Sequence, residues 1–249
     1  MNQIDLSFIA SKLESFEETI IYKLIDRAQY CRNQVAYKKG KSGFGKEESR
    51  SLMELRVYYQ ENMDSIFGRY CIPEERPFNT LLSPPKRQIE LSQKDLYIDN
   101  FNKINLTSSI LPKYLDLISA ICPKGDDGHY GSSVEYDVYA LQAISRRIHF
   151  GAMYVAESKF RASPSEYQKL IDHNDKDGLL KRLTRPEVES RIIERIAKKT
   201  SALQTCSNSN TRNIITPESI VDFYKNTVIP LTKEGEIIYL LNRKEELNT

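Results

Sequence analysis

The sequence predicts an all-α protein. Apolar residues recur at spacings of three and four along most of the 249-residue chain, which is the period of an amphipathic helix. No stretch sustains the alternation of apolar and polar residues that is typical of a half-buried strand. The chain is long enough for one large helical domain and shows no internal repeat, so we expect a single multi-helix bundle over residues 1–249.

The first expected element is a long amphipathic helix over residues 6–24. Its apolar stripe, which we expect to pack in the core, consists of Leu6, Ile9, Leu13, Phe16, Ile20 and Leu24. Residues 38–45 are rich in lysine and glycine, but they lack the second half of a phosphate-binding loop and no strand precedes them. We therefore interpret residues 38–45 as a solvated loop, with phosphate binding as the alternative.

Prolines divide the middle of the chain. Residues 72–86 carry four prolines and must run extended between helices. Helical periodicity resumes over residues 93–121, where Pro112 should break or kink the helix. A loop over residues 123–132 then leads into a long helix over residues 133–161.

Shorter helices are expected in the last third of the chain. The periodicity predicts helices within residues 164–182 and a further helix over residues 186–202. Pro186 suits the first position of that helix, and Thr184 is its candidate cap. The last two helices are expected over residues 216–227 and 231–246.

The composition limits the classes of function. The 36 basic and 34 acidic side chains nearly cancel and are interspersed, which argues against a nucleic-acid footprint or a polybasic membrane anchor. The four cysteines lie far apart and the three histidines fall in no metal-ligand spacing, so we expect reduced, mostly buried thiols and no metal site. The N-terminus lacks the pattern of a signal peptide, and no apolar run is long enough to span a bilayer. We therefore expect a cytoplasmic protein with neither nucleic-acid nor membrane partners.

The most informative stretch is residues 141–160, a mostly apolar helical segment that carries Arg146, Arg147 and Lys159. A cation in such surroundings is costly unless an anion satisfies it. Either these cations form salt bridges with carboxylates inside the bundle, or they face a pocket that receives a negatively charged ligand.

The same stretch resembles a helix of the all-helical chorismate mutases of the yeast and plant type. Residues 70–78, 125–132 and 229–241 resemble further motifs of that family, in the family's order. The resemblance covers most of the chain, but residues 33–50 and 205–214 match poorly and are expected to be mobile loops. It implies the family's single-domain helical fold and an isomerase that converts chorismate to prephenate, in the shikimate pathway of phenylalanine and tyrosine biosynthesis.

The resemblance also implies the roles of individual residues. Arg147 matches the family residue that binds a substrate carboxylate, and Thr232 would assist there. Lys159 and a protonated Glu236 would donate hydrogen bonds to the ether oxygen, and Glu189 would accept one from the ring hydroxyl. The reaction is a pericyclic rearrangement, so no metal or organic cofactor is expected.

One spacing departs from the family. Arg147 and Lys159 are twelve residues apart, which leaves them about 120° apart around an ideal helix, whereas the family's eleven nearly align them. A single-turn π-bulge within residues 151–154 would absorb the extra residue and restore the shared face.

A second departure concerns the first helix, where the family has a carboxylate-binding Arg and this chain has Ala10. Lys12 lies about 200° further round the helix and is no simple substitute. We hypothesise that Arg185 binds the substrate instead. One alternative is a catalytically impaired, chorismate-mutase-like regulatory or interaction protein. Another is a helical nucleic-acid or partner-binding module that uses Arg146, Arg147 and the lysine-rich loop over residues 38–45.

Family members of this type are homodimers regulated by aromatic amino acids (Tyr, Trp or Phe) at the dimer interface. Arg69, Gly131 and Ser132 match effector-binding positions. Gly68 stands where the yeast-type pattern has a second Arg, and Glu135 replaces a Thr. A plain turn and helix cap is the alternative interpretation of Gly131 and Ser132.

Overall fold

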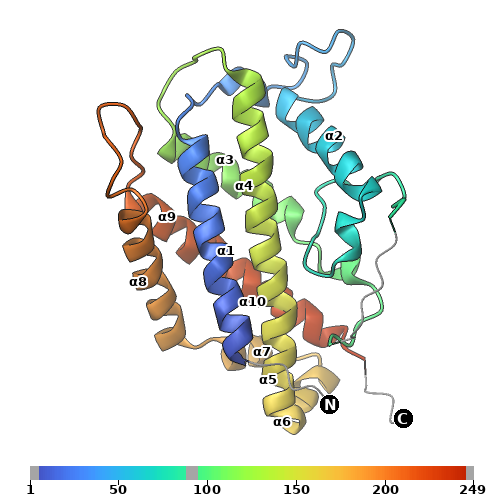
Figure 1. The fold of residues 1–249 in the computed structure, drawn as a ribbon. Helices are drawn as coiled ribbons and strands as arrows, with labels where there is room; N and C mark the ends of the chain where they lie inside the picture. The colour runs from blue at the N-terminus through green and yellow to red at the C-terminus, as the bar shows by residue number, and fades with distance from the viewer. Residues whose placement is uncertain (1–5, 88–94, 245–249) are drawn as a thin grey trace.

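The chain forms a helical bundle. The computed structural model describes residues 6–87 and 95–244, and these contain helices and no strand (Figure 1). The all-α prediction is therefore confirmed. Two long helices, α1 (Leu6–Arg27) and α4 (Tyr130–Phe150), lie side by side and run in opposite directions at the centre of the bundle.

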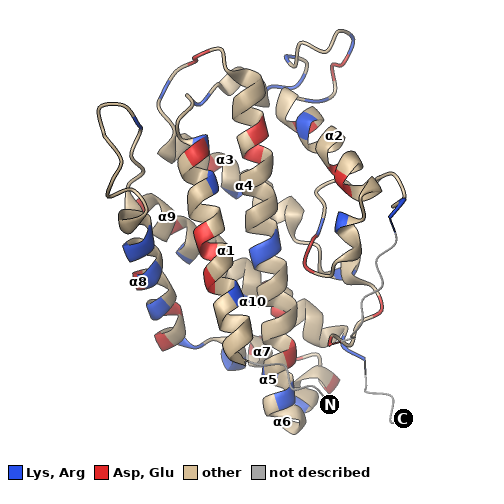
Figure 2. Cartoon of the chain, in the orientation of Figure 1, with Lys and Arg blue, Asp and Glu red and all other residues tan. Residues whose placement is uncertain are grey.

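The other helices surround this pair. On one side α2 (Leu52–Ile66) packs against α4, and on the other α8 (Pro186–Ala202) packs against α1. The main apolar core lies between α1, α4 and α3 (Thr107–Ile121), where Tyr114 is fully buried. Basic and acidic residues are interspersed along the helices in the view of Figure 2. No helix in the described part of the chain is both long and apolar enough to cross a membrane.

A buried ion pair joins the ends of the two central helices. Arg27 and Asp137 are both fully buried, and Arg27 Nε lies 2.6 Å from Asp137 Oδ1. Tyr37 and Tyr114 each donate a hydroxyl to the same carboxylate at 2.7 Å. A buried charge pair is tolerated only when its remaining hydrogen bonds are satisfied, so this network fixes the pairing of α1 with α4.

The apolar stripe of the first helix is core only in part. Four of its six residues are buried, namely Ile9, Phe16, Ile20 and Leu24. The prediction is wrong for Leu6, whose side chain is 63% exposed, and Leu13 is only half-buried. The reason is that the start of α1 runs past the edge of the core and lines a pocket there.

The helix α2 was not predicted. It begins with a capping box in which Glu54 N donates to Ser51 Oγ at 3.2 Å and Ser51 N donates to Glu54 Oε2 at 2.7 Å. This pattern of Ser followed by Glu three residues later is readable in a sequence.

The helix expected over residues 93–121 is shorter than predicted. Residues 88–94 lie outside the described part, and residues 95–106 hold only the short 3₁₀-helix η3 (Phe101–Ile104). Asparagine side chains there accept hydrogen bonds from nearby backbone N–H groups, for example from Thr107 N to Asn105 Oδ1, and such bonds compete with a helix. The helix α3 continues through Pro112, which neither ends nor starts it.

The long helix is confirmed and begins slightly earlier than predicted. It comprises α4, the π-helix η4 (Gly151–Val155) and α5 (Ala156–Ala162), without interruption. The expected shorter helices follow as α6 (Pro164–Asp172) and α7 (Lys176–Leu183).

Two predictions about helix ends are wrong. Thr184 does not cap α8, because its hydroxyl donates to Leu180 O at 2.8 Å and Arg185 takes the cap position. The last two helices form one continuous element, in which α9 (Pro217–Phe223) passes through the π-helix η5 (Tyr224–Val228) into α10 (Ile229–Leu241). The wide turn of η5 comes just before Pro230, where a regular helix would clash with the proline ring.

The cysteines are free, as expected, but only Cys122 is buried and Cys206 is exposed.

Candidate active site

A cavity of about 250 Å³ lies between α1, α5, α8 and α10, at the end of the bundle where α1 begins. Its walls come from segments far apart in the sequence. The six residues expected to bind or transform a substrate all line it, and they are Arg147, Lys159, Arg185, Glu189, Thr232 and Glu236.

The π-helix accounts for the joint position of Arg147 and Lys159. Residues 151–155 form the wide turn that the twelve-residue spacing predicts. A π-turn takes up one more residue than an α-turn, so it rotates the following helix back toward the face it would otherwise lose. Arg147 before the turn and Lys159 after it therefore line the same cavity.

Arg147 has one nitrogen that is hydrogen-bonded within the protein and one that has no partner among the described residues. It is only 3% exposed, and one terminal nitrogen, NH1, donates to Thr232 Oγ1 at 3.2 Å. Thr232 in turn donates to Val228 O at 2.7 Å. Among the described residues the buried Nε of Arg147 has no hydrogen-bond partner. Because an unpaired buried donor is costly, this guanidinium is suited to an anion entering the cavity.

Lys159 and Glu236 form a close pair. The Lys159 ammonium lies 2.9 Å from Glu236 Oε2 and donates to Leu183 O at 3.0 Å, which leaves one of its three N–H groups for another acceptor. Burial raises the pKa of Glu236, although Lys159 acts in the opposite direction. Burial thus favours a neutral carboxylic acid that can donate a hydrogen bond.

Glu189 lies at the rim and is paired with Lys233, whose Nζ donates to Glu189 Oε1 at 3.0 Å. Lys233 also lines the cavity and was not predicted. Its position could have been inferred, because it lies three residues before Glu236 and so shares a side of the last helix.

The mouth of the cavity includes both Ala10 and Arg185. Arg185 is exposed, and within residues 6–87 and 95–244 it forms no ion pair. Arg146 lies elsewhere. Its Nε is 3.2 Å from Glu75 Oε1 and its guanidinium stacks over Phe16, so this cation is paired with a carboxylate outside the cavity.

The expected effector residues are not brought together within one chain. Arg69 pairs with Asp64 and donates to Gln142 Oε1 at 2.7 Å. Gly131 and Ser132 lie in the first turn of α4, and Gly131 is eleven residues before Gln142. At 1.5 Å per residue this separates them by about 16 Å along the helix.

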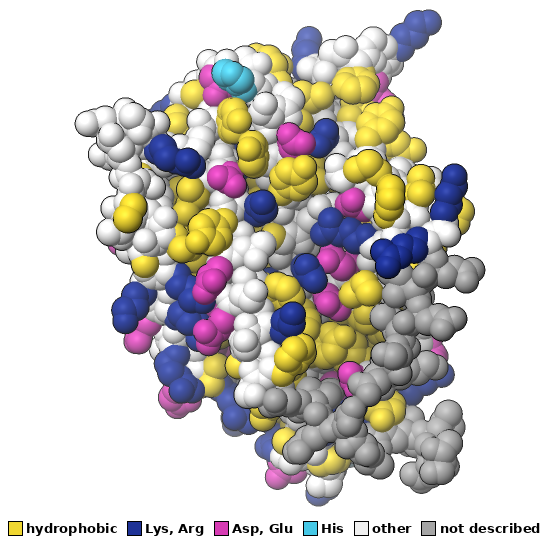
Figure 3. All heavy atoms as spheres, viewed as in Figure 1, with side chains coloured by type: hydrophobic (Ala, Val, Ile, Leu, Met, Phe, Trp, Pro, Cys, Tyr) yellow, Lys and Arg dark blue, Asp and Glu magenta, His cyan; other side chains and the backbone are white. Residues whose placement is uncertain are grey.

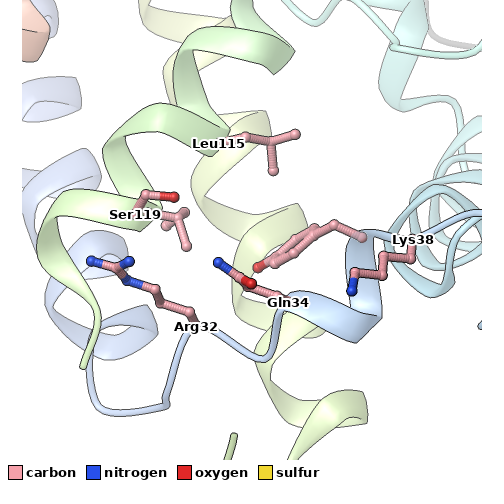
Figure 4. A pocket seen from close by; sticks show the side chains of 7 residues that line it. Arg32, Gln34, Lys38, Leu115 and Ser119 are labelled. Carbon is pink, nitrogen blue, oxygen red and sulfur yellow. The ribbon is translucent and has the colours of Figure 1, made fainter. Parts of the chain in front are cut away.

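A second hollow, of about 260 Å³, lies between α3 and the 3₁₀-helix η1 (Gln34–Tyr37) (Figure 4). Arg32 and Lys38 supply two cations there, and Leu115 and Ser119 form a wall. Its described lining includes no carboxyl group, so it lacks the combination of acid and base found in the cavity at α10.

Known proteins resemble the chain over nearly its full length. The chorismate mutase of Schizosaccharomyces pombe is 34% identical over 247 residues, which cover 97% of each chain. No family model matches the chain.

Solved structures share its fold. The Aro7p chorismate mutase of Candida albicans in complex with L-Trp is similar with a TM-score of 0.89 and 33% identity, over 98% of this chain and 94% of that one. AtCM1 with tyrosine bound in its allosteric site is similar with a TM-score of 0.85 and 36% identity, over 96% of each chain. The similarity therefore extends to the whole bundle.

Proposed function

Because the chain belongs to the all-helical chorismate mutase family of the yeast and plant type, we infer that it is an isomerase that converts chorismate to prephenate. We place this step in phenylalanine and tyrosine biosynthesis. We assign the reaction to the cavity at α10 because Arg147, Lys159 and Glu236 all line it.

Arg147 holds one carboxylate of the substrate. Its unpartnered Nε and the planar guanidinium offer two parallel donors to a carboxylate. Thr232 fixes the other side of the guanidinium, so the fork is oriented before the substrate arrives. Chorismate must adopt a compact chair that water does not favour, and gripping its carboxylates keeps the reacting carbons close.

Lys159 and Glu236 stabilise the transition state. Negative charge grows on the ether oxygen as its bond to carbon breaks, so donors aimed at that atom bind the transition state more tightly than the substrate. Lys159 contributes its free N–H, and Glu236 contributes the O–H of a carboxylic acid, the form that its burial favours by raising its pKa. No proton needs to be transferred.

Glu189 accepts the hydrogen bond of the ring hydroxyl. Its pairing with Lys233 holds one carboxylate oxygen and leaves the other for the substrate. Lys233 thereby determines where Glu189 points.

Arg185 binds the second carboxylate. It takes the place of the arginine that the family has at the position of Ala10. Support comes from its position in the cavity lining, its lack of an ion pair in the described residues, and its place at the N-terminus of α8, where the helix dipole favours an anion. The retained Arg147, Lys159 and Glu236 also favour an isomerase over an impaired regulatory or interaction protein.

We further propose that the protein is a cytoplasmic homodimer of single-domain subunits. Tyr59 and Met63 on α2 and Phe67, which caps its C-terminus, are all at least half exposed and follow one another at intervals of four residues, as one apolar stripe. Figure 3 shows hydrophobic side chains gathered over this part of the surface. A second copy packed there would bury the stripe.

Aromatic amino acids are the proposed effectors, since the similar structures hold L-Trp and tyrosine. Arg69 contacts Gln142, which lies about 16 Å along α4 from Gly131. Arg69 could therefore share a ligand with Gly131 and Ser132 only across two subunits. That separation supports an effector site at the dimer interface.

The experiment that tests the proposed function is conversion of chorismate by the purified protein. We expect prephenate to form far faster than in the same buffer without protein. No conversion above that baseline would overturn the assignment. If the Ala10→Arg variant were active while the wild type was not, the natural site would be an impaired one.

A further inference from the structure

The helix α10 crosses the π-helix η4 at very short range. A Cβ atom added to Gly235 would lie 2.5 Å from Ala152 Cβ and 3.1 Å from Leu106 Cδ1. One turn earlier on α10, Thr232 covers Gly151, where an added Cβ would lie 2.8 Å from Thr232 Cγ2. Gly235 on α10 and Gly151 on η4 therefore allow the backbones of these two elements to approach each other closely.

The glycine at position 235 is not required by its own backbone. The glycines with positive φ in the described residues do not include Gly235, so its conformation is open to any residue. Alanine is favoured over glycine inside a helix by about 1 kcal/mol. The missing side chain must therefore serve the contact with Ala152.

This contact lies between the groups that act on the substrate. Gly235 directly precedes Glu236 on α10, and Ala152 belongs to the wide turn that carries the chain toward Lys159. Lys159 Nζ and Glu236 Oε2 meet at 2.9 Å. Their separation follows from how closely the two backbones approach.

We propose that Gly235 is a positioning residue for the chorismate mutase reaction, because its missing side chain lets α10 lie close enough to the π-helix for Glu236 to reach Lys159. The proposal rests on the proposed function. A methyl group at position 235 needs about 1 Å more room to restore an ordinary carbon–carbon contact of 3.5–4.0 Å. A shift of that size takes the pair beyond hydrogen-bond range.

The test is a double-mutant cycle on chorismate turnover with Gly235→Ala, Ala152→Gly and the double variant. Gly235→Ala should lower kcat by about 10²-fold, the scale expected for a 1 Å misplacement, with a smaller change in KM. The double variant should regain most of that loss. Without the Ala152 methyl, the nearest atoms to the new Cβ are Leu106 Cδ1 at 3.1 Å and the backbone Cα of residue 152 at 3.7 Å.

Glu234→Ala is the matched control, since Glu234 lies next to Gly235 but is exposed and outside the cavity lining. Its kcat should stay at the wild-type value. Circular dichroism and thermal unfolding confirm that each variant is folded.

A folded Gly235→Ala variant with wild-type kcat overturns the proposal. If that variant does not fold, the double variant decides: recovery of turnover supports positioning, and a folded double variant with kcat still about 10²-fold low overturns it. A wild type without turnover overturns the proposed function itself, which distinguishes the two failures.

Discussion

Replacing Lys159 by Ala should remove most of the rate enhancement. In the structure Lys159 Nζ makes two fixed contacts, to Glu236 at 2.9 Å and to Leu183 O at 3.0 Å. These contacts orient its third N–H before the substrate binds. Loss of one such preorganised donor costs about 10²–10³ in kcat, or roughly 2.7–4 kcal/mol of transition-state stabilisation.

The same change should alter the pH dependence. Lys159 is the main group that lowers the pKa of Glu236, whose burial raises it. Without Lys159 the pKa of Glu236 rises further, so the acid stays protonated to higher pH. The residual activity of Lys159→Ala should therefore persist to higher pH than that of the wild type.

The assay is steady-state chorismate consumption across a pH series. Lys113→Ala is the matched control, because Lys113 is exposed on α3 and lies outside the cavity lining. Turnover of Lys159→Ala within about threefold of the wild type would refute the reasoning, since a preorganised donor is expected to contribute far more.

Three further predictions concern other residues. Activity should decline as pH rises through the raised pKa of Glu236, and Glu236→Gln should flatten that decline because the amide still donates; an unchanged pH profile in the Gln variant would show that another group titrates. Arg185→Asn should sharply reduce chorismate turnover and Ala10→Arg should rescue it, whereas a harmless Arg185→Asn would remove Arg185 from the site. Burial lowers the pKa of His149 to about 3 in the folded protein. Between this value and the ordinary pKa of about 6.5, His149 therefore binds a proton in the unfolded state but not in the folded state. The free energy of unfolding should consequently decrease as pH falls from about 6.5 toward about 3. In urea titrations His149→Gln should reduce this loss by up to about 1.4 kcal/mol per pH unit, and an unchanged slope would exclude His149 as its source.

Local patterns predicted much of the fold. The helix that begins at Pro186 and ends at Ala202 was predicted with its bounds, because a proline at the first position and a sustained period mark it clearly. The helix α2 was missed even though Ser51 and Glu54 carry its capping box. An α-helix was wrongly expected over residues 95–106. Leu96 and Ile104 are buried eight residues apart, which matches a helical period, although they lie in a loop and in the short 3₁₀-helix η3.

The site depended on distances that a sequence does not contain. The wide turn after Phe150 was predicted only because the family resemblance supplied a spacing to compare with. Lys233 and Gly235 were missed, because their roles follow from how closely Glu189 and Ala152 approach them from other elements.

The most direct test of the account compares chorismate turnover in Arg147→Ala and Arg32→Ala. Arg147 lies in the cavity at α10 and Arg32 in the second hollow, so each variant removes one arginine from one site. We predict that Arg147→Ala loses about 10²-fold or more in kcat/KM, while Arg32→Ala stays within about twofold of the wild type. Near-normal turnover in a folded Arg147→Ala variant, or a comparable loss in Arg32→Ala, would contradict the placement of the reaction in this cavity.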